Sequence, residues 1–199
     1  MTKHFLCIYI STLLAGCAAS VASKYEVNQE VDRFNDNRTK ATMTGGVIDA
    51  DYLGIVANPA SFNPFVVRSR ENAILATGIQ FSLEVTGSKD WLNIREGSTA
   101  TFLLNNGPDK ITLKASQGNI DYSVSRPQNV VYTKRLDSGV FQMKPDQLAK
   151  IAYATSVEVR VAGASSYIDF PRKPNNHLVE NFLPNLRKFY ETEVKPYLR

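Results

Sequence analysis

Residues 79–86 read IQFSLEVT, and in this stretch apolar and polar side chains alternate one by one. Alternation with a period of two puts one face of a strand on a core and the other in water, which is typical of antiparallel sheets. The same alternation recurs at residues 110–116, 120–124 and 157–161, and shorter strand candidates lie at residues 65–68, 99–104, 129–134, 140–144 and 166–170. The chain is therefore predicted to be mainly β.

Turn-forming residues separate these stretches. They occur at residues 87–88, 96–97, 105–108, 117–119 and 137–139 and at Gly163. About eight or nine short strands at such spacing predict an antiparallel β-sandwich or a flattened barrel. A folded part of this length buries enough apolar surface to need neither a disulfide nor a metal ion for its stability.

Two segments carry helical patterns instead. Residues 145–152 (PDQLAKIA) begin with a proline that suits a first helical turn, so we expect a short connecting helix there. Pro184 lies inside a second pattern, and we expect a kink or a restart at that residue. That pattern begins at Asn176 and predicts a C-terminal helix whose apolar stripe, packed on the sheet, comprises Leu178, Phe182, Leu186, Phe189 and Tyr190.

The beginning of the chain has the layout of a secretory signal peptide. Residues 1–4 are polar and include Lys3, and residues 5–14 (FLCIYISTLL) form an apolar stretch that small residues follow. A membrane-spanning helix needs about 20 apolar residues, so this stretch is too short to span a bilayer. An ordinary leader would be cut near residues 18–20 or 22–23.

Residues 14–17, Leu-Ala-Gly-Cys, resemble the lipobox of bacterial lipoprotein precursors, in which an aliphatic residue and two small residues precede a cysteine. The resemblance implies cleavage between Gly16 and Cys17 and a diacylglycerol on the Cys17 sulfur. Several acyl chains hold a protein firmly on a membrane, whereas one chain binds only marginally. Ala18 stands where an aspartate favours retention in the inner membrane, so the resemblance implies the outer membrane, facing the periplasm.

These patterns divide the chain into three parts. We expect a signal peptide over residues 1–16, a lipidated cysteine and flexible tether over residues 17–31, and a single β-sandwich domain with a C-terminal helix over residues 32–199. The order of a short helix, a valine-rich strand and a final helix also resembles uncharacterised β-sandwich domains of bacterial envelope lipoproteins. That resemblance implies no activity.

The inventory of reactive side chains is small. Of two cysteines and two histidines, Cys7 and His4 fall in the leader and Cys17 is the expected lipidation site, which leaves His177 in the domain. Zinc sites of cysteine and histidine and a cysteine nucleophile are therefore excluded for the mature domain, and no nucleotide-binding or hydrolase motif occurs. We expect no enzymatic activity, no metal ion and no cofactor, and a solvated His177.

Three further features bear on partners. The formal net charge of +4 is spread over scattered pairs of basic residues, so we expect no nucleic-acid partner. Asp49 and Asp51 flank Ala50, but no neighbouring acids support a calcium or acid–base site, and we expect a loop there. Trp91, the only tryptophan, is a candidate ligand-binding residue, although packing over one end of the sandwich is the plainer interpretation.

Taken together, these features predict a non-enzymatic, membrane-anchored module that binds another envelope protein or supports an assembly. The alternative is a glycan- or lipid-binding envelope lipoprotein with Trp91, Tyr122 and Tyr132 as contacts. A hydrolase that uses carboxylates alone is a third possibility and needs two acids that converge in a cleft. A concave, aromatic-lined pocket would favour the glycan or lipid ligand, and a flat apolar patch would favour the protein partner.

Overall fold

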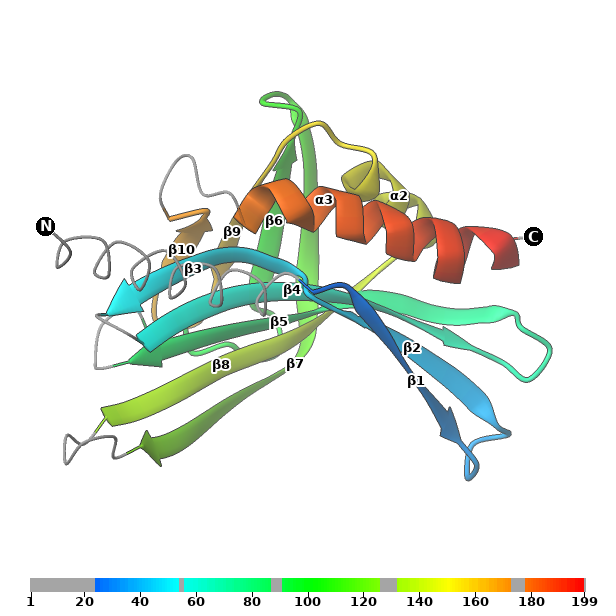
Figure 1. Ribbon diagram of the computed structural model, residues 1–199, viewed down its shortest axis with the longest axis horizontal. Coiled ribbons are helices and arrows are strands. Elements are labelled where there is room, and N and C mark those ends of the chain that lie inside the picture. Colours follow the sequence, from blue (N-terminus) through cyan, green and yellow to red (C-terminus); the bar gives the residue numbers. More distant parts are fainter. Residues whose placement is uncertain (1–23, 54–55, 87–90, 126–131, 173–177, 199) are drawn as a thin grey trace, which may run out of the picture.

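A computed structural model describes residues 24–53, 56–86, 91–125, 132–172 and 178–198 (Figure 1). Its strands form one antiparallel sheet in the order β1-β2-β4-β5-β8-β7-β6-β9-β10, with β3 paired to β4 beside this path. The strands are β1 (Glu26–Asp32), β2 (Arg38–Thr44), β3 (Val47–Leu53), β4 (Val56–Arg68), β5 (Ile74–Thr86), β6 (Thr99–Leu104), β7 (Asp109–Ser125), β8 (Tyr132–Met143), β9 (Val157–Ala162) and β10 (Tyr167–Phe170).

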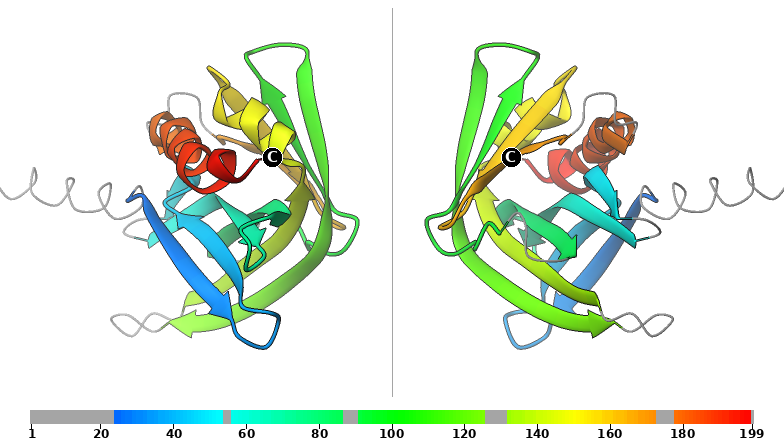
Figure 2. Two further views of the ribbon diagram at one scale, coloured as in Figure 1. Left: turned by 90° about the vertical axis from the view of Figure 1, so that its right-hand side faces the viewer. Right: turned by 90° about the vertical axis from the view of Figure 1, so that its left-hand side faces the viewer.

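In the described ranges the α-helices are α2 (Pro145–Ala152) and α3 (Leu178–Phe189). A π-helical segment over Tyr190–Val194 and a 3-10 turn over Lys195–Tyr197 continue α3 toward the C-terminus. Figures 1 and 2 show that the sheet curves strongly and that α3 lies across its open side. The helix therefore covers apolar surface that the curved sheet does not close over itself.

The long strand β7 connects the two halves of the sheet. Its residues 109–114 pair with β6, and its residues from Ala115 onward pair with β8. A bulge between Ala115 and Gln117 separates the two pairings. Because a bulge bends a strand and increases its twist, β7 can serve both halves, and the sheet folds over on itself.

The core lies between these two halves and α3. The ring of Phe62 in β4 is central, with its centroid 4.8–6.4 Å from four other rings, and each of these rings is buried. These partners are Phe81 in β5, Phe102 in β6, Phe170 in β10 and Phe182 in α3. Aromatic contacts thus join both halves of the sheet to the C-terminal helix.

The predicted fold class is confirmed: the protein is mainly antiparallel β, with a short connecting helix and a C-terminal helix. The connecting helix has the predicted bounds, residues 145–152. The two faces of the predicted sandwich belong to one bent sheet of ten strands, which is not closed. The C-terminal helix runs through Pro184 without a restart.

Two predicted turns are wrong, because both segments lie inside long strands. Residues 117–119 belong to β7, residues 137–139 belong to β8, and Gly118 pairs with Gly139 across the ladder. Glycine in a strand often marks a close approach of another backbone rather than a turn. The loop after β5 makes that approach here, as described below.

The predicted tether is wrong from Glu26 onward, because Glu26–Asp32 forms β1 and pairs with β2. Only Val27 packs against the core, and the other side chains of β1 are exposed, so the strand has a polar composition that resembles a linker. Polar and charged side chains are common on edge strands because they discourage pairing with other chains. The predicted signal peptide, Gly16 and Cys17 lie outside the described residues.

The aromatic core predicts a large effect of truncating Phe182. We expect Phe182→Ala to lower the free energy of unfolding by about 3–5 kcal/mol, because it opens a cavity where α3 meets the sheet. Chemical denaturation measures this change. The control is Phe34→Ala, at a fully exposed position, with an expected effect below about 0.5 kcal/mol. Similar losses in the two variants would contradict the position of α3.

Candidate functional site

Trp91 begins a short extended segment, residues 91–95, that leads from β5 toward β6 and is called the strap below. Along the strap the side chains of Leu92 and Ile94 are buried, while Trp91 and Arg95 are exposed. The strap thus enters the core with alternate side chains, although it pairs with no strand as part of a ladder. Its first residue is the one that the sequence singles out as a candidate binding residue.

Three glycines make room for the strap. A methyl group on Gly118 would overlap the carbonyl oxygen of Ile94, and one on Gly163 would overlap the carbonyl oxygen of Leu92. A Cβ atom on Gly139 would lie 2.7 Å from Cγ2 of Ile94. These glycines come from β7, from β8 and from the turn after β9, so the strap is in close contact with three separate parts of the fold.

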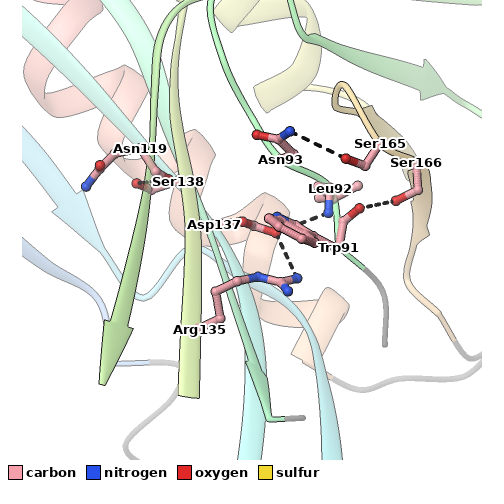
Figure 3. A network of polar contacts seen from close by, with 9 residues as sticks. All are labelled: Trp91, Leu92, Asn93, Asn119, Arg135, Asp137, Ser138, Ser165 and Ser166. Carbon is pink, nitrogen blue, oxygen red and sulfur yellow. Dashed lines mark hydrogen bonds and ion pairs between the residues drawn. The ribbon is translucent and has the colours of Figure 1, made fainter. Parts of the chain in front are cut away.

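Hydrogen bonds fasten the strap to the turn between β9 and β10 (Figure 3). The Ser166 hydroxyl donates to the carbonyl oxygen of Trp91 at 2.6 Å, and the Ser165 amide donates to that of Leu92 at 3.1 Å. The Ala164 amide donates to the carbonyl oxygen of Asn93, also at 3.1 Å. Three successive backbone carbonyls of the strap therefore have fixed partners.

An ion pair on β8 holds the other side of the strap. The Leu92 amide donates to Oδ2 of Asp137 at 3.2 Å, and the Arg135 guanidinium lies 3.3 Å from the same oxygen. Asp137 is fully buried and Arg135 is 5% exposed. Removing one partner of a buried ion pair leaves an uncompensated charge, so this pair is costly to break.

The indole of Trp91 lies over Arg135. The guanidinium carbon is 5.0 Å from the ring centroid, which is within the range of a cation–π contact. Trp91 remains 43% exposed, so one part of the ring rests on Arg135 and another part is accessible. The backbone carbonyl of Trp91 and its ring thus both have partners, while part of the ring stays exposed.

Strand β7 adds two exposed side chains beside Arg135. Tyr122 is directly opposite Arg135 in the β7–β8 ladder, and Val124 follows on the same face of the strand. They are 57% and 62% exposed, because the two strands extend here past the end of the core. We call Trp91, Tyr122, Val124 and Arg135 the Trp91 patch.

A hollow of about 270 Å³ lies on the opposite face of the same strands, because Glu84 and Asp121 both pair with Leu136, whereas Tyr122 pairs with Arg135. It is lined by Glu84, Asp121, Tyr122, Lys134, Arg135 and Leu136. Most of these side chains are charged, and Lys134 pairs with Glu84 at 3.1 Å. The hollow has a single aromatic side chain in its lining and is smaller than the ~300–1,000 Å³ that is typical of small-molecule sites.

The structure brings together two of the residues that the sequence proposes as contacts, Trp91 and Tyr122, on either side of Arg135. The side chain of Tyr132 lies outside the described part, as do Cys17 and His177. Within the described ranges, no cluster of three or more His, Cys, Asp or Glu side chains lies close enough to hold a metal ion.

The expectation that Asp49 and Asp51 lie in a loop is wrong, because both are residues of β3. Asp49 belongs to β3, is almost fully buried, and forms an ion pair with Arg172 at 2.5 Å. The backbone amide of Arg172 also donates to the carboxylate of Asp49, at 3.2 Å. The contact ties β3 to the segment after β10, which gives Asp49 a structural role.

Sequence reasoning missed Arg135 and Asp137. Their signal is the alternation in β8, where Arg135, Asp137, Gly139, Phe141 and Met143 share the buried face. The polar and glycine positions in this series resemble a turn, which concealed the strand. In the observed arrangement the two charges of the buried ion pair neutralise each other, and the exposed side chains next to them are aromatic or aliphatic.

Comparison with protein-family models, with characterised proteins and with solved structures finds no match for this chain. Within the described ranges, no helix has the length and apolar character that spanning a membrane requires.

A substitution at Gly163 tests the close packing of the strap against the turn after β9. We expect Gly163→Ala to lower the free energy of unfolding by about 1–3 kcal/mol, because the added methyl group overlaps the Leu92 carbonyl. The displaced strap would also expose more of Trp91 and shift its fluorescence emission to longer wavelength. Denaturation followed by this fluorescence measures both effects.

Gly107→Ala is the matched control for this experiment. A Cβ atom at Gly107 would meet its nearest neighbour, the carbonyl oxygen of Asn105, at an ordinary contact distance of 3.4 Å. We expect a change in stability within about 0.5 kcal/mol and no shift in Trp91 emission. If Gly163→Ala changes stability and Trp91 emission no more than this control does, the strap does not pack against Gly163.

Proposed function

We propose that this protein is a non-enzymatic, lipid-anchored module of the bacterial cell envelope that binds a protein partner through the Trp91 patch. One observation carries the proposal: the single tryptophan is exposed although its carbonyl oxygen, its ring and the amide of the next residue, Leu92, all have partners. Exposed aromatic side chains of this kind dominate the binding energy of many protein interfaces. A side chain whose position is already fixed loses little conformational freedom on binding.

The composition of the patch supports a protein partner. Trp91 and Tyr122 supply large aromatic surfaces, Val124 adds an aliphatic one, and Arg135 lies between them. Tryptophan and tyrosine are among the residue types most enriched at energetically important interface positions. Arg135 is only 5% exposed, so it supports the Trp91 ring from below rather than offering surface to the partner.

The proposed anchor rests on the lipobox resemblance at residues 14–17 and on the short apolar stretch before it. Lipid on Cys17 would hold the domain close to the membrane, because β1 begins at Glu26 and only eight residues, 18–25, separate the two. Eight extended residues span at most about 28 Å. A partner of the Trp91 patch would then be an envelope protein within reach of the same membrane, which we place at the outer membrane on its periplasmic side.

Site-specific photo-crosslinking in living cells tests the partner. We expect a photoreactive amino acid at Tyr122 to give one defined crosslinked protein, and we expect Trp91→Ala in the same chain to reduce that product at least about fivefold. Immunoblotting and mass spectrometry measure and identify the product.

The matched control position is Tyr167 in β10, which is 61% exposed and lies outside the patch. No product of the same size is expected there. Equal crosslinking from Tyr122 and Tyr167, or a product that Trp91→Ala does not change, would contradict binding through the patch. Binding of purified protein to cell-wall glycan with loss in Trp91→Ala would instead establish the alternative ligand.

The anchor has its own test. We expect Cys17→Ser to move the protein from the membrane fraction to the soluble fraction and to abolish incorporation of radioactive palmitate, because the thiol is the lipid acceptor. Cys7→Ser removes the other cysteine of the chain and is expected to leave both properties unchanged. Membrane retention of Cys17→Ser would refute the proposed anchor.

A further inference from the structure

A groove beside α3 has the size and lining of a ligand site. Its volume is about 790 Å³, within the range typical of small-molecule sites. Its lining combines small and apolar side chains of residues 154–157 and Leu183 with the cationic side chains of Arg187 and Lys188 and the carboxylate of Glu191. This combination matches an amphipathic ligand that carries negative charge.

The cations of the groove belong to a larger basic surface on the solvent side of α3. Arg187, Lys188 and Lys195 are all exposed on this side. Glu191 is the one acid in the lining of the groove, and Lys195 compensates it through an ion pair at 3.0 Å. The surface therefore keeps the positive charge of Arg187 and Lys188.

Tyrosine side chains accompany these cations. Tyr153 is 46% exposed, its hydroxyl donates to Glu191, and the Arg187 guanidinium lies 5.4 Å from its ring centroid. Tyrosine together with lysine or arginine is characteristic of protein surfaces at the headgroup level of a membrane, where each side chain has an apolar body and a polar end. Tyr153 lies at the end of α2, next to the groove.

The chain that leads to Cys17 begins at the same surface. The Lys188 ammonium lies 4.3 Å from the ring centroid of Tyr25, the residue before β1. Burial raises the pKa of the Tyr25 hydroxyl, and a hydrogen bond with Thr192 opposes that rise. The start of the domain is therefore packed against the C-terminal half of α3, on the side that carries the cations.

From these observations we propose that the groove between α3 and residues 154–157 binds an anionic phospholipid of the membrane that carries the anchor, with Arg187 and Lys188 at the phosphate. This inference rests on the proposed lipid on Cys17, because the short connection from Cys17 to Tyr25 starts at this surface and keeps it within reach of the bilayer. Basic residues near an anionic membrane each contribute about 1 kcal/mol of attraction. The domain would thus be oriented on the membrane as well as attached to it.

Cosedimentation with vesicles tests the groove. The protein carries Cys17→Ser, so that its own lipid cannot cause binding, and the vesicles contain phosphatidylcholine either alone or mixed with phosphatidylglycerol. We expect binding to the mixed vesicles only, and weaker binding as salt rises. Lys188→Glu reverses the charge of a proposed phosphate contact, and Lys195→Glu leaves Glu191 in the groove without its ion-pair partner. Adding both substitutions is expected to reduce vesicle affinity at least about tenfold.

The matched control is Lys110→Glu with Lys114→Glu, which makes the same charge change at exposed positions on β7. This control is expected to keep its vesicle affinity within about twofold. Equal binding to both kinds of vesicle, no binding to either, or equal losses in the two charge variants would overturn the proposal. The outcome is separable from the proposed anchor and partner, because Cys17 carries no lipid in this experiment and Trp91→Ala is expected to leave vesicle binding unchanged.

Discussion

The arrangement of the site depends on the packing of the strap, residues 91–95, against three glycines. Leu92 and Ile94 reach the core only because Gly118, Gly139 and Gly163 have no side chains where the strap passes. In this position the Leu92 amide donates a hydrogen bond to Asp137, and backbone amides of the turn after β9 donate to carbonyl oxygens of the strap. The position of Trp91 thus depends on the close packing of the strap against these three glycines.

The curvature of the sheet accounts for the two surfaces to which we assign functions. Bending at the β7 bulge leaves an open side that α3 covers through Phe182, and it leaves the far ends of β7 and β8 beyond the core. In Figure 1 the end of β7 and the C-terminus lie at opposite ends of the molecule. A partner on the Trp91 patch and a membrane at α3 could therefore be bound together.

Sequence patterns predicted the parts of the fold that have one buried face. Residues 79–86 alternate and form part of β5, residues 145–152 form α2, and Phe182, Leu186 and Phe189 are buried as the apolar stripe requires. The edge strand β1 escaped prediction because little of it is buried. The glycines of β7 and β8 were misread because local sequence does not distinguish a turn from a close approach by a distant segment. Trp91 and Tyr122 were identifiable as residue types, but their common neighbour Arg135 depends on strand register.

The central claim is that Trp91 is both exposed and held in one orientation. Because the chain has a single tryptophan, time-resolved fluorescence anisotropy of the purified protein reports on this side chain alone. The account predicts that the indole decays almost entirely with the tumbling of the whole molecule, while acrylamide still quenches its fluorescence. A decay dominated by local motion on the picosecond-to-nanosecond timescale, or an indole that acrylamide cannot reach, would contradict it.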